Sequence, residues 1–475
     1  MKTPTLKLFV TVILIAILGS LAAGCAKDQD PTAVQPKATL APNVQPEASP
    51  TPDVQPQASQ TPDAQPEASP APTLPPEQDQ APVQIVESKV QRIIAPDAPP
   101  ADLAQLVDGN SAFAFDLYQA LRDREGNLFY SPYSISLALA MTYAGARGET
   151  EQQMAETLRF TLAQERLHPA LNALDLALTA QANQDFELNI ANSLWGQADY
   201  AFLAEFLDTL AQNYGAGLRL LDFESAPEPS RQTINEWVSE QTEERIMDLI
   251  PQGAITPLTR LVLANAIYFD AEWVHPFAKD LTRDAPFYTL DGGQVSAPMM
   301  AMNDPAMLSY AQGAGYQAVE LPYQGNEMSM LVVVPDAGQF ESFEAALDAK
   351  QVDAILEQVE SKRVVLNMLK FTYESKIGLA GTLAGMGMPN AFGNADFSGM
   401  DGTHDFVISG VFHKAFVAVD EAGTEAAAAT AVVVGLTSIA PEPDVVLTVD
   451  RPFVFVIRDM ESGTILFVGR VVNPG

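Results

Sequence analysis

The chain has 475 residues, 47% of them hydrophobic, and its 26 Lys and Arg residues face 60 Asp and Glu residues, a formal net charge of −34. A polyanion of this size repels phosphate backbones, which excludes nucleic acid as a partner, and its folded part is repelled by anionic lipid. The single cysteine, Cys25, excludes an intramolecular disulfide framework, and the four histidines are widely spaced, so no metal or other cofactor is predicted.

Residues 1–25 have the pattern of an export signal. A positively charged start is followed by an apolar run from Leu8 to Leu18 and by small residues directly before Cys25. The run is shorter than the roughly 20 residues that span a bilayer. The segment resembles a bacterial lipoprotein signal, so we expect Cys25 to be lipidated and to anchor the exported chain to the cell envelope. An uncleaved membrane anchor and an ordinary secreted protein are the alternatives.

Residues 26–100 have a composition that does not form a packed core. The tripeptide Val-Gln-Pro recurs at Val34, Val44 and Val54, and Ala-Gln-Pro follows at Ala64, which gives a ten-residue repeat. Proline fixes φ and donates no hydrogen bond, and the few large apolar residues cannot offset the entropy of ordering. We expect a disordered, extended tether that holds the following domain away from a membrane.

Residues 101–475 form the predicted folded domain and carry most of the acidity, with 20 basic against 50 acidic side chains. Apolar spacing predicts helices over 109–121, 134–144, 149–158 and 235–250, the last ending before a proline. Strand-like runs dominate after residue 407. Helices first and strands later indicate an α+β fold. The sequence contains no G-x-S-x-G, H-E-x-x-H or P-loop motif, and we predict no enzymatic activity.

Residues 420–440 are the distinctive segment of this domain. Side chains from Ala422 to Ala431 are mostly small, and no proline interrupts the segment. Alternate positions from Thr424 to Val434 share one face, while Glu425 falls on the other. Such a segment can be exposed at first and later enter a sheet as a strand that buries the small face. An alanine-rich helical loop is the alternative, since alanine is the best helix former.

Seven segments of the domain, in order, resemble the serpin family, and the resemblance covers essentially the whole of residues 101–475. They begin at Asn127 (NLFYSPYSISLALAMTYAGARGET), Ile234 (INEWVSEQTEERIMDLI), Leu263 (LANAIYFDAEWVHPF), Glu320 (ELPYQGNEMSMLVVVP), Leu383 (LAGMGMPNAFGNADFSGM), His413 (HKAFVAVDEAGTEAAAA) and Leu447 (LTVDRPFVFVIRDMESGTILFVGRVVNP). The resemblance implies helices packed on three β-sheets, with an exposed reactive-centre loop.

The resemblance also implies a mechanism, suicide-substrate inhibition of extracellular serine proteases. The protease attacks the loop and forms an acyl-enzyme, and the cleaved loop then inserts into the central sheet and drags the protease with it. The expected partner is therefore a serine protease held as a covalent acyl complex by a monomeric chain. A non-inhibitory serpin that acts as a binding module is the alternative, and a loop that is cut without trapping is a third possibility.

The resemblance assigns the hinge and the reactive bond. Family spacing places the bond between Thr437 and Ser438, and cleavage after Leu436 or Ile439 is the alternative. These residue types suit elastase-, subtilisin- or chymotrypsin-like proteases, and the stretch between Lys414 and Arg451 contains no basic residue for a trypsin-like one. The hinge pattern matches Glu421, Gly423, Thr424, Glu425, Ala426, Ala427, Ala428, Ala429 and Thr430.

The resemblance further assigns a polar cluster beneath the opening sheet. Its side chains would hydrogen-bond to one another while the sheet parts and recloses, and Trp273 lies where the loop would enter. The members of the cluster are Ser131, Ser134, Asn265 and His413.

Overall fold

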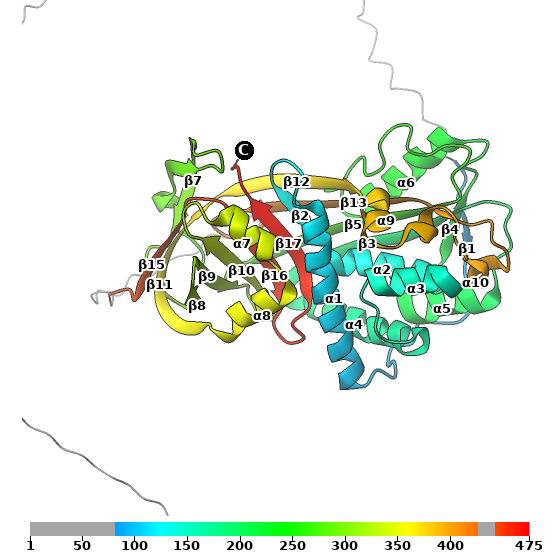
Figure 1. Ribbon diagram of the computed structural model, residues 1–475, viewed down its shortest axis with the longest axis horizontal. Coiled ribbons are helices and arrows are strands. Elements are labelled where there is room, and N and C mark those ends of the chain that lie inside the picture. The colour runs from blue at the N-terminus through cyan, green and yellow to red at the C-terminus, as the bar shows by residue number, and fades with distance from the viewer. Residues whose placement is uncertain (1–80, 426–441, 475) are drawn as a thin grey trace, which may run out of the picture. The chain divides into compact units, whose positions relative to one another are not determined.

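The computed structural model describes residues 81–425 and 442–474 (Figure 1). These residues belong to one compact unit, Pro75–Gly475. The expected signal, most of the expected tether and the expected reactive bond lie outside the described residues. Within the described ranges, no helix is both long and apolar enough to cross a membrane.

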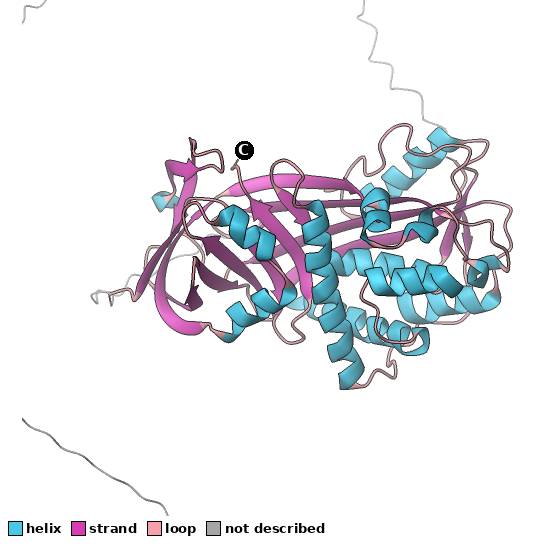
Figure 2. Cartoon of the chain, in the orientation of Figure 1, coloured by secondary structure: helices cyan, strands magenta, loops and turns pink. Residues whose placement is uncertain are grey.

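Helices form a substantial part of the fold, as Figure 2 shows. The α-helices are α1 (Pro100–Leu121), α2 (Pro132–Tyr143), α3 (Gly148–Thr157), α4 (Gln164–Asp185), α5 (Ala204–Tyr214), α6 (Pro227–Gln241), α7 (Phe340–Ala346), α8 (Ala349–Glu357), α9 (Ala380–Met386) and α10 (Ser398–Asp401). Two short 3-10 helices are η1 (Lys279–Leu281) and η2 (Pro389–Phe392).

Two helix boundaries differ from the sequence-based prediction. The helix predicted over 109–121 begins at Pro100, because proline at the first helical position presets φ and needs no N–H partner. The helix predicted over 235–250 is α6, which begins at Pro227 and ends at Gln241. Glu243, Glu244 and Asp248 have φ of 49°, 63° and 53°, and a left-handed backbone cannot continue a right-handed helix.

One sheet has seven strands in the order β1-β4-β3-β5-β14-β13-β12. Its strands are β1 (Gln84–Val86), β3 (Phe186–Gln197), β4 (Leu218–Leu221), β5 (Leu261–Glu272), β12 (Phe371–Gly378), β13 (Ile408–Val419) and β14 (Gly423–Thr424). In this sheet β5 and β13 are parallel neighbours over most of their length, which is the relationship that matters for the site.

The other sheet has ten strands, and hydrogen bonds run through all of them. They are β2 (Leu128–Tyr130), β6 (Arg283–Tyr288), β7 (Gln294–Ala301), β8 (Ala306–Gly313), β9 (Tyr316–Pro322), β10 (Met328–Pro335), β11 (Glu360–Leu369), β15 (Val445–Val449), β16 (Phe453–Asp459) and β17 (Ile465–Val471). The resemblance implies three sheets. The described strands form two, because the long strand β11 pairs with β8 at its start and with β7 at its end.

The two faces of the seven-stranded sheet pack against different layers. Side chains on one face of β5 join the main core with α2 and the ten-stranded sheet. Those on the other face, Val262, Ala264 and Ala266, form a second cluster with Ile234 and Val238 of α6. In Figure 1, α6 lies on the opposite side of the long strands from α2 and α3. The helix α6 therefore covers the face that a new strand would disturb.

Residues 81–98 differ from the disordered tether expected for them. β1 extends the edge of the sheet by pairing antiparallel with β4, and the backbone N–H of Ala81 donates to Thr233 Oγ1 of α6 at 3.1 Å. Arg92 donates to Asn172 Oδ1 at 2.8 Å and pairs with Asp175 of α4 at 2.6 Å. These contacts with residues far along the chain order the segment.

Candidate functional site

The start of the predicted hinge is already part of the seven-stranded sheet. β14 lies between β5 and β13, with Gly423 opposite Glu272, and Thr424 opposite both Ala271 and Val419. Further along, β5 and β13 pair directly with each other. The first rungs of an inserted strand therefore exist at one end of the seam between β5 and β13.

Only glycine fits at position 423. A Cβ built on Gly423 would lie 2.0 Å from the carbonyl oxygen of Ala271. Real Cβ contacts do not come this close, and the neighbour is backbone, which cannot rotate away. The close approach of the two strands thus depends on the missing side chain.

Thr424 is buried and hydrogen-bonds to Tyr323, which stacks on Trp273. It is 1% exposed, and its Oγ1 shares a hydrogen bond of 2.7 Å with the hydroxyl of Tyr323. Burial raises the pKa of Tyr323 well above its usual range, so the hydroxyl stays protonated. The Tyr323 ring stacks on Trp273 with 4.4 Å between centroids. Trp273 Nε1 in turn donates to the carbonyl oxygen of Asp420 at 3.1 Å. The structure thus places Trp273 at the hinge.

Glu421 fastens the hinge to the other sheet. Its carboxylate accepts from Lys370 Nζ at 2.8 Å and from Thr282 Oγ1 at 2.7 Å. Burial opposes ionisation of Glu421, but the hydrogen bonds from Lys370 and Thr282 outweigh it, and the pKa of Glu421 is lowered. The carboxylate is therefore ionised at neutral pH and holds the chain just before β14.

Glu425 lies on the opposite face from Thr424, as the alternation predicts. Its backbone N–H donates to the carbonyl oxygen of Ala418 at 2.6 Å, and its Oε1 pairs with Arg245 Nη1 at 2.8 Å. The rest of the predicted hinge, Ala426 to Thr430, lies outside the described residues, as do Thr437, Ser438 and Cys25. The described part of the chain resumes at residue 442 and leads into β15 of the ten-stranded sheet.

The predicted polar cluster crosses the same seam. In the sheet register, Asn192 of β3, Asn265 of β5 and His413 of β13 form one row. Asn265 Nδ2 donates to Ser134 Oγ at 2.6 Å, and Asn265 Oδ1 hydrogen-bonds to His413 Nδ1. The backbone N–H of Ser131 donates to His413 Nε2 at 3.2 Å. A strand entering between β5 and β13 would have to separate Asn265 from His413.

The protonation state of His413 follows from these partners. Because Nε2 accepts a hydrogen bond, Nδ1 carries the hydrogen and donates it to Asn265. Burial lowers the pKa of His413 to about 3, so the ring is neutral. Ser131 also caps α2, since its Oγ accepts from the backbone N–H of Ser134 at 3.1 Å. The structure therefore brings all four predicted residues together.

Asn192 belongs to this cluster, although the sequence-based prediction missed it. Its Oδ1 accepts from Ser134 Oγ, and its Nδ2 donates to the carbonyl oxygen of Ser134, both at 3.1 Å. The signal available in the sequence was alternation along β3, where Asn192 shares a face with the buried Leu194. That alternation does not reveal which strand becomes the neighbour.

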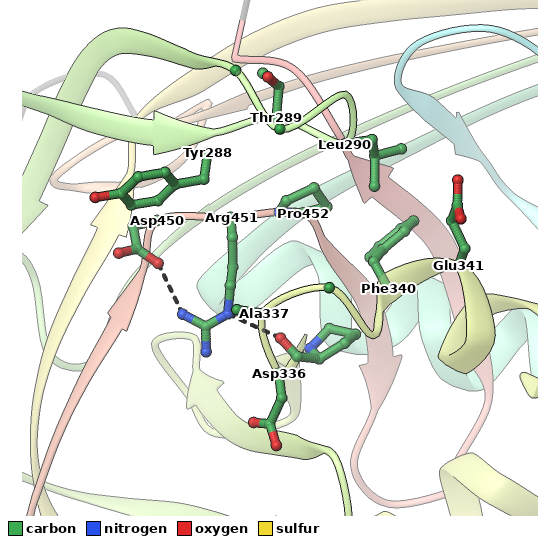
Figure 3. A pocket seen from close by; sticks show the side chains of 14 residues that line it. Tyr288, Thr289, Leu290, Asp336, Ala337, Phe340, Glu341, Asp450, Arg451 and Pro452 are labelled. Carbon is green, nitrogen blue, oxygen red and sulfur yellow. Dashed lines mark hydrogen bonds and ion pairs between the residues drawn. The ribbon is translucent and has the colours of Figure 1, made fainter.

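A cavity of about 400 Å³ opens elsewhere, between the turn after β6, the start of α7 and the turn before β16 (Figure 3). None of the predicted site residues lines it. Arg451 at its centre is already bound, with Nε donating to the carbonyl oxygen of Pro335 at 2.9 Å and Nη1 to Asp450 at 2.8 Å. Among the residues that the structure describes, no group of three or more His, Cys, Asp or Glu side chains could hold a metal ion.

Comparisons with known proteins agree with this geometry. Residues 108–474 match the family model described as serpin (serine protease inhibitor). The chain is 39% identical over 373 residues to an uncharacterized serpin-like protein of Thermococcus kodakarensis, covering 78% of this chain and 86% of the relative. It is 38% identical over 383 residues to the leukocyte elastase inhibitor of Homo sapiens, covering 78% of this chain and 100% of the relative.

A solved structure gives the same result. The native state of tengpin, a thermophilic serpin, matches with a TM-score of 0.73 at 27% identity, covering 82% of this chain and 100% of tengpin. The family model, the relatives and the fold therefore agree that this chain belongs to the serpin family.

Proposed function

We propose that the chain inhibits serine proteases by trapping the acyl-enzyme, through insertion of the loop after Thr424 as a new strand between β5 and β13. The observation that carries this proposal is β14, which occupies the first rungs of that position. The residues from Ala426 to Ala431 are small, so they can fill the start of the seam without steric conflict. Because β5 and β13 now pair with each other, a strand inserted between them would replace one strand pairing with two.

We propose an elastase-, subtilisin- or chymotrypsin-like target and cleavage between Thr437 and Ser438. The related leukocyte elastase inhibitors support the first class, and the lack of Lys and Arg between Lys414 and Arg451 argues against trypsin-like enzymes. The acidity of the chain is expected to attract cationic proteases, so their association rate should fall as ionic strength rises.

The direct experiment mixes the chain with elastase or subtilisin and separates the products on a denaturing gel. A covalent complex that survives heating, together with a released C-terminal peptide beginning at Ser438, is the expected result. Cleavage without a complex across a panel of serine proteases would refute inhibition. A Thr437→Arg variant provides the matched test of the bond, because it should transfer inhibition to trypsin.

We further propose that Cys25 is lipidated and that the following repeats act as a spacer from the cell envelope. The small residues before Cys25 and the proline-rich composition support this proposal. In a bacterial host, the mature chain should partition into detergent, and the Cys25→Ser variant should not. A soluble mature chain that begins elsewhere would show ordinary secretion.

A further inference from the structure

The ion pair between Arg245 and Glu425 joins two parts of the chain with different tasks. Glu425 is the third residue of the hinge that enters the sheet. Arg245 lies in the segment that follows α6, the helix that covers this face of the sheet. Its Nη1 lies 2.8 Å from Glu425 Oε1, and its guanidinium carbon lies 5.5 Å from the centroid of the Tyr268 ring on β5. The hinge and the covering segment are thus directly bound.

The covering segment, residues 242–248, crosses the seam that a longer inserted strand would occupy. Arg245 contacts Tyr268 of β5, Lys414 Nζ of β13 donates to the carbonyl oxygen of Met247 at 2.9 Å, and Lys376 of β12 hydrogen-bonds to that of Asp248. Between the last direct β5–β13 pair, Ile267 with Ala415, and the β14 rungs, the two strands do not pair with each other. Glu425 follows β14 directly into this gap, beneath the covering segment.

The backbone on both sides of the ion pair adopts a conformation that non-glycine residues disfavour. Glu425 has a φ of 56°, and Glu243, Glu244 and Asp248 of the covering segment have φ between 49° and 63°. Residues persist in this left-handed region only when their surroundings hold them there. The hinge and the covering segment are therefore held in place by their surroundings rather than by their own backbone preferences.

The carboxylate of Glu425 has one favourable and one unfavourable charged neighbour. Its side chain is only 7% exposed, and its Oε2 makes no hydrogen bond to any described residue. Arg245 favours the charged form of Glu425, whereas Asp270 of β5 opposes it. The nearby carboxylates of Glu187 and Glu272 contribute to raising the pKa of Asp270. Burial, opposed by Arg245, raises the pKa of Glu425 to about 7.

We propose that Glu425 and Arg245 form a pH-responsive clasp that decides whether the start of the reactive loop stays docked in the sheet. The proposal rests on the proposed function, because loop entry is the step that the clasp controls. A released hinge exposes Glu425, whose pKa then returns to the ordinary 4.5. The docked hinge binds the proton more tightly, so docking weakens as the pH rises from 4.5 to 7 and does not weaken further above pH 7. Between these two pKa values, the ratio of docked to released hinge changes on the order of 100-fold.

The test follows the full chain without protease between pH 4 and 8.5. Amide hydrogen exchange of the peptide around Glu425, corrected for the intrinsic rate, reports the bond to Ala418, and Trp273 fluorescence reports the Tyr323–Thr424 contact. We expect protection to fall progressively from pH 4.5 to pH 7 and to stay constant above it. Glu425→Gln should remain protected across the range, and Arg245→Gln should extend the fall to higher pH, because the cation that favours ionisation is lost.

Two control variants separate the clasp from other titrating groups. His275→Gln removes the histidine two positions after Trp273, and Glu341→Gln removes a matched, exposed charge on α7. Both should keep the transition. A pH profile without a change between pH 4.5 and 7, or one unchanged in Glu425→Gln, would overturn the clasp even if the chain inhibits proteases. A transition that depends on Glu425, in a chain that forms no covalent complex, would leave the clasp standing and refute the proposed function.

Discussion

Tyr323 and Thr424 share a buried hydrogen bond of 2.7 Å between their hydroxyl groups, which joins the residue after β9 to the first rungs of the hinge. The Tyr323 ring stacks on Trp273, and Thr424 is 1% exposed, so its hydroxyl is buried and satisfied by this hydrogen bond. A larger or charged side chain at this position cannot enter the sheet. Several outcomes can be predicted from this and the neighbouring contacts.

Thr424→Arg should convert the chain from an inhibitor into a substrate. Burying an unpaired guanidinium costs several kcal/mol, so β14 should leave the sheet and the cleaved loop should insert too slowly to trap the protease. Gel quantification of covalent complex against cleaved chain measures the effect. Val446→Arg is the control, because Val446 is 61% exposed on β15. An unchanged complex yield in Thr424→Arg would contradict the insertion model.

Lys370→Gln should destabilise the native state by about 1–3 kcal/mol, because it removes a charged donor from the buried Glu421 carboxylate. The pKa of Glu421 is lowered in the fold, so its contribution is present above the ordinary pKa of 4.5 and is lost as the pH falls below it. The destabilisation caused by Lys370→Gln should therefore be smaller at acidic pH. Urea unfolding at pH 7.5 and pH 4 tests this, with Lys362→Gln at an exposed pair as the control.

The buried histidines should make the fold sensitive to acid. The pKa of His413 is lowered from 6.5 to about 3 and that of His168 to about 4, both mainly by burial. Their contribution to stability is complete above pH 6.5 and falls as the pH drops toward these values, by at most about 1.4 kcal/mol per pH unit for each group. His168→Phe should reduce the slope of unfolding free energy against pH between 6 and 4. The exposed His404→Asn should leave it unchanged.

Arg92→Gln should lower the melting temperature, because it breaks the half-buried pair with Asp175 and weakens the attachment of residues 81–98. Loss of such a pair costs about 1 kcal/mol, a shift of a few degrees at most for a domain of this size. Differential scanning fluorimetry measures it, and Lys89→Gln serves as the exposed control. Deletion of residues 1–98 should lower the melting temperature more than deletion of residues 1–80. Equal melting temperatures for the two truncations would show that β1 contributes nothing to the stability of the sheet.

Much of the fold and part of the site could be predicted from the sequence. The ordered motifs identified the family, and the small residues after Gly423 indicated a segment able to become a strand. Local periodicity did not predict where α6 ends, because the stop at Gln241 arises from left-handed backbone at Glu243 and Glu244 rather than from the later Pro251. It also assigned residues 81–98 to a tether, because their attachment to the sheet depends on partners far along the chain.

The sequence by itself determined the acidity, the export signal pattern, the alternation that sets Thr424 and Glu425 on opposite faces, and the need for glycine-like smallness at the hinge. These properties depend on residues within a few positions of one another. Only the tertiary structure decided that Asn192 completes the polar row with Asn265 and His413, and that Arg245 meets Glu425. Such contacts depend on strand register and on burial, which removes water from both partners, and residues far apart in sequence acquire these conditions only when the chain has folded.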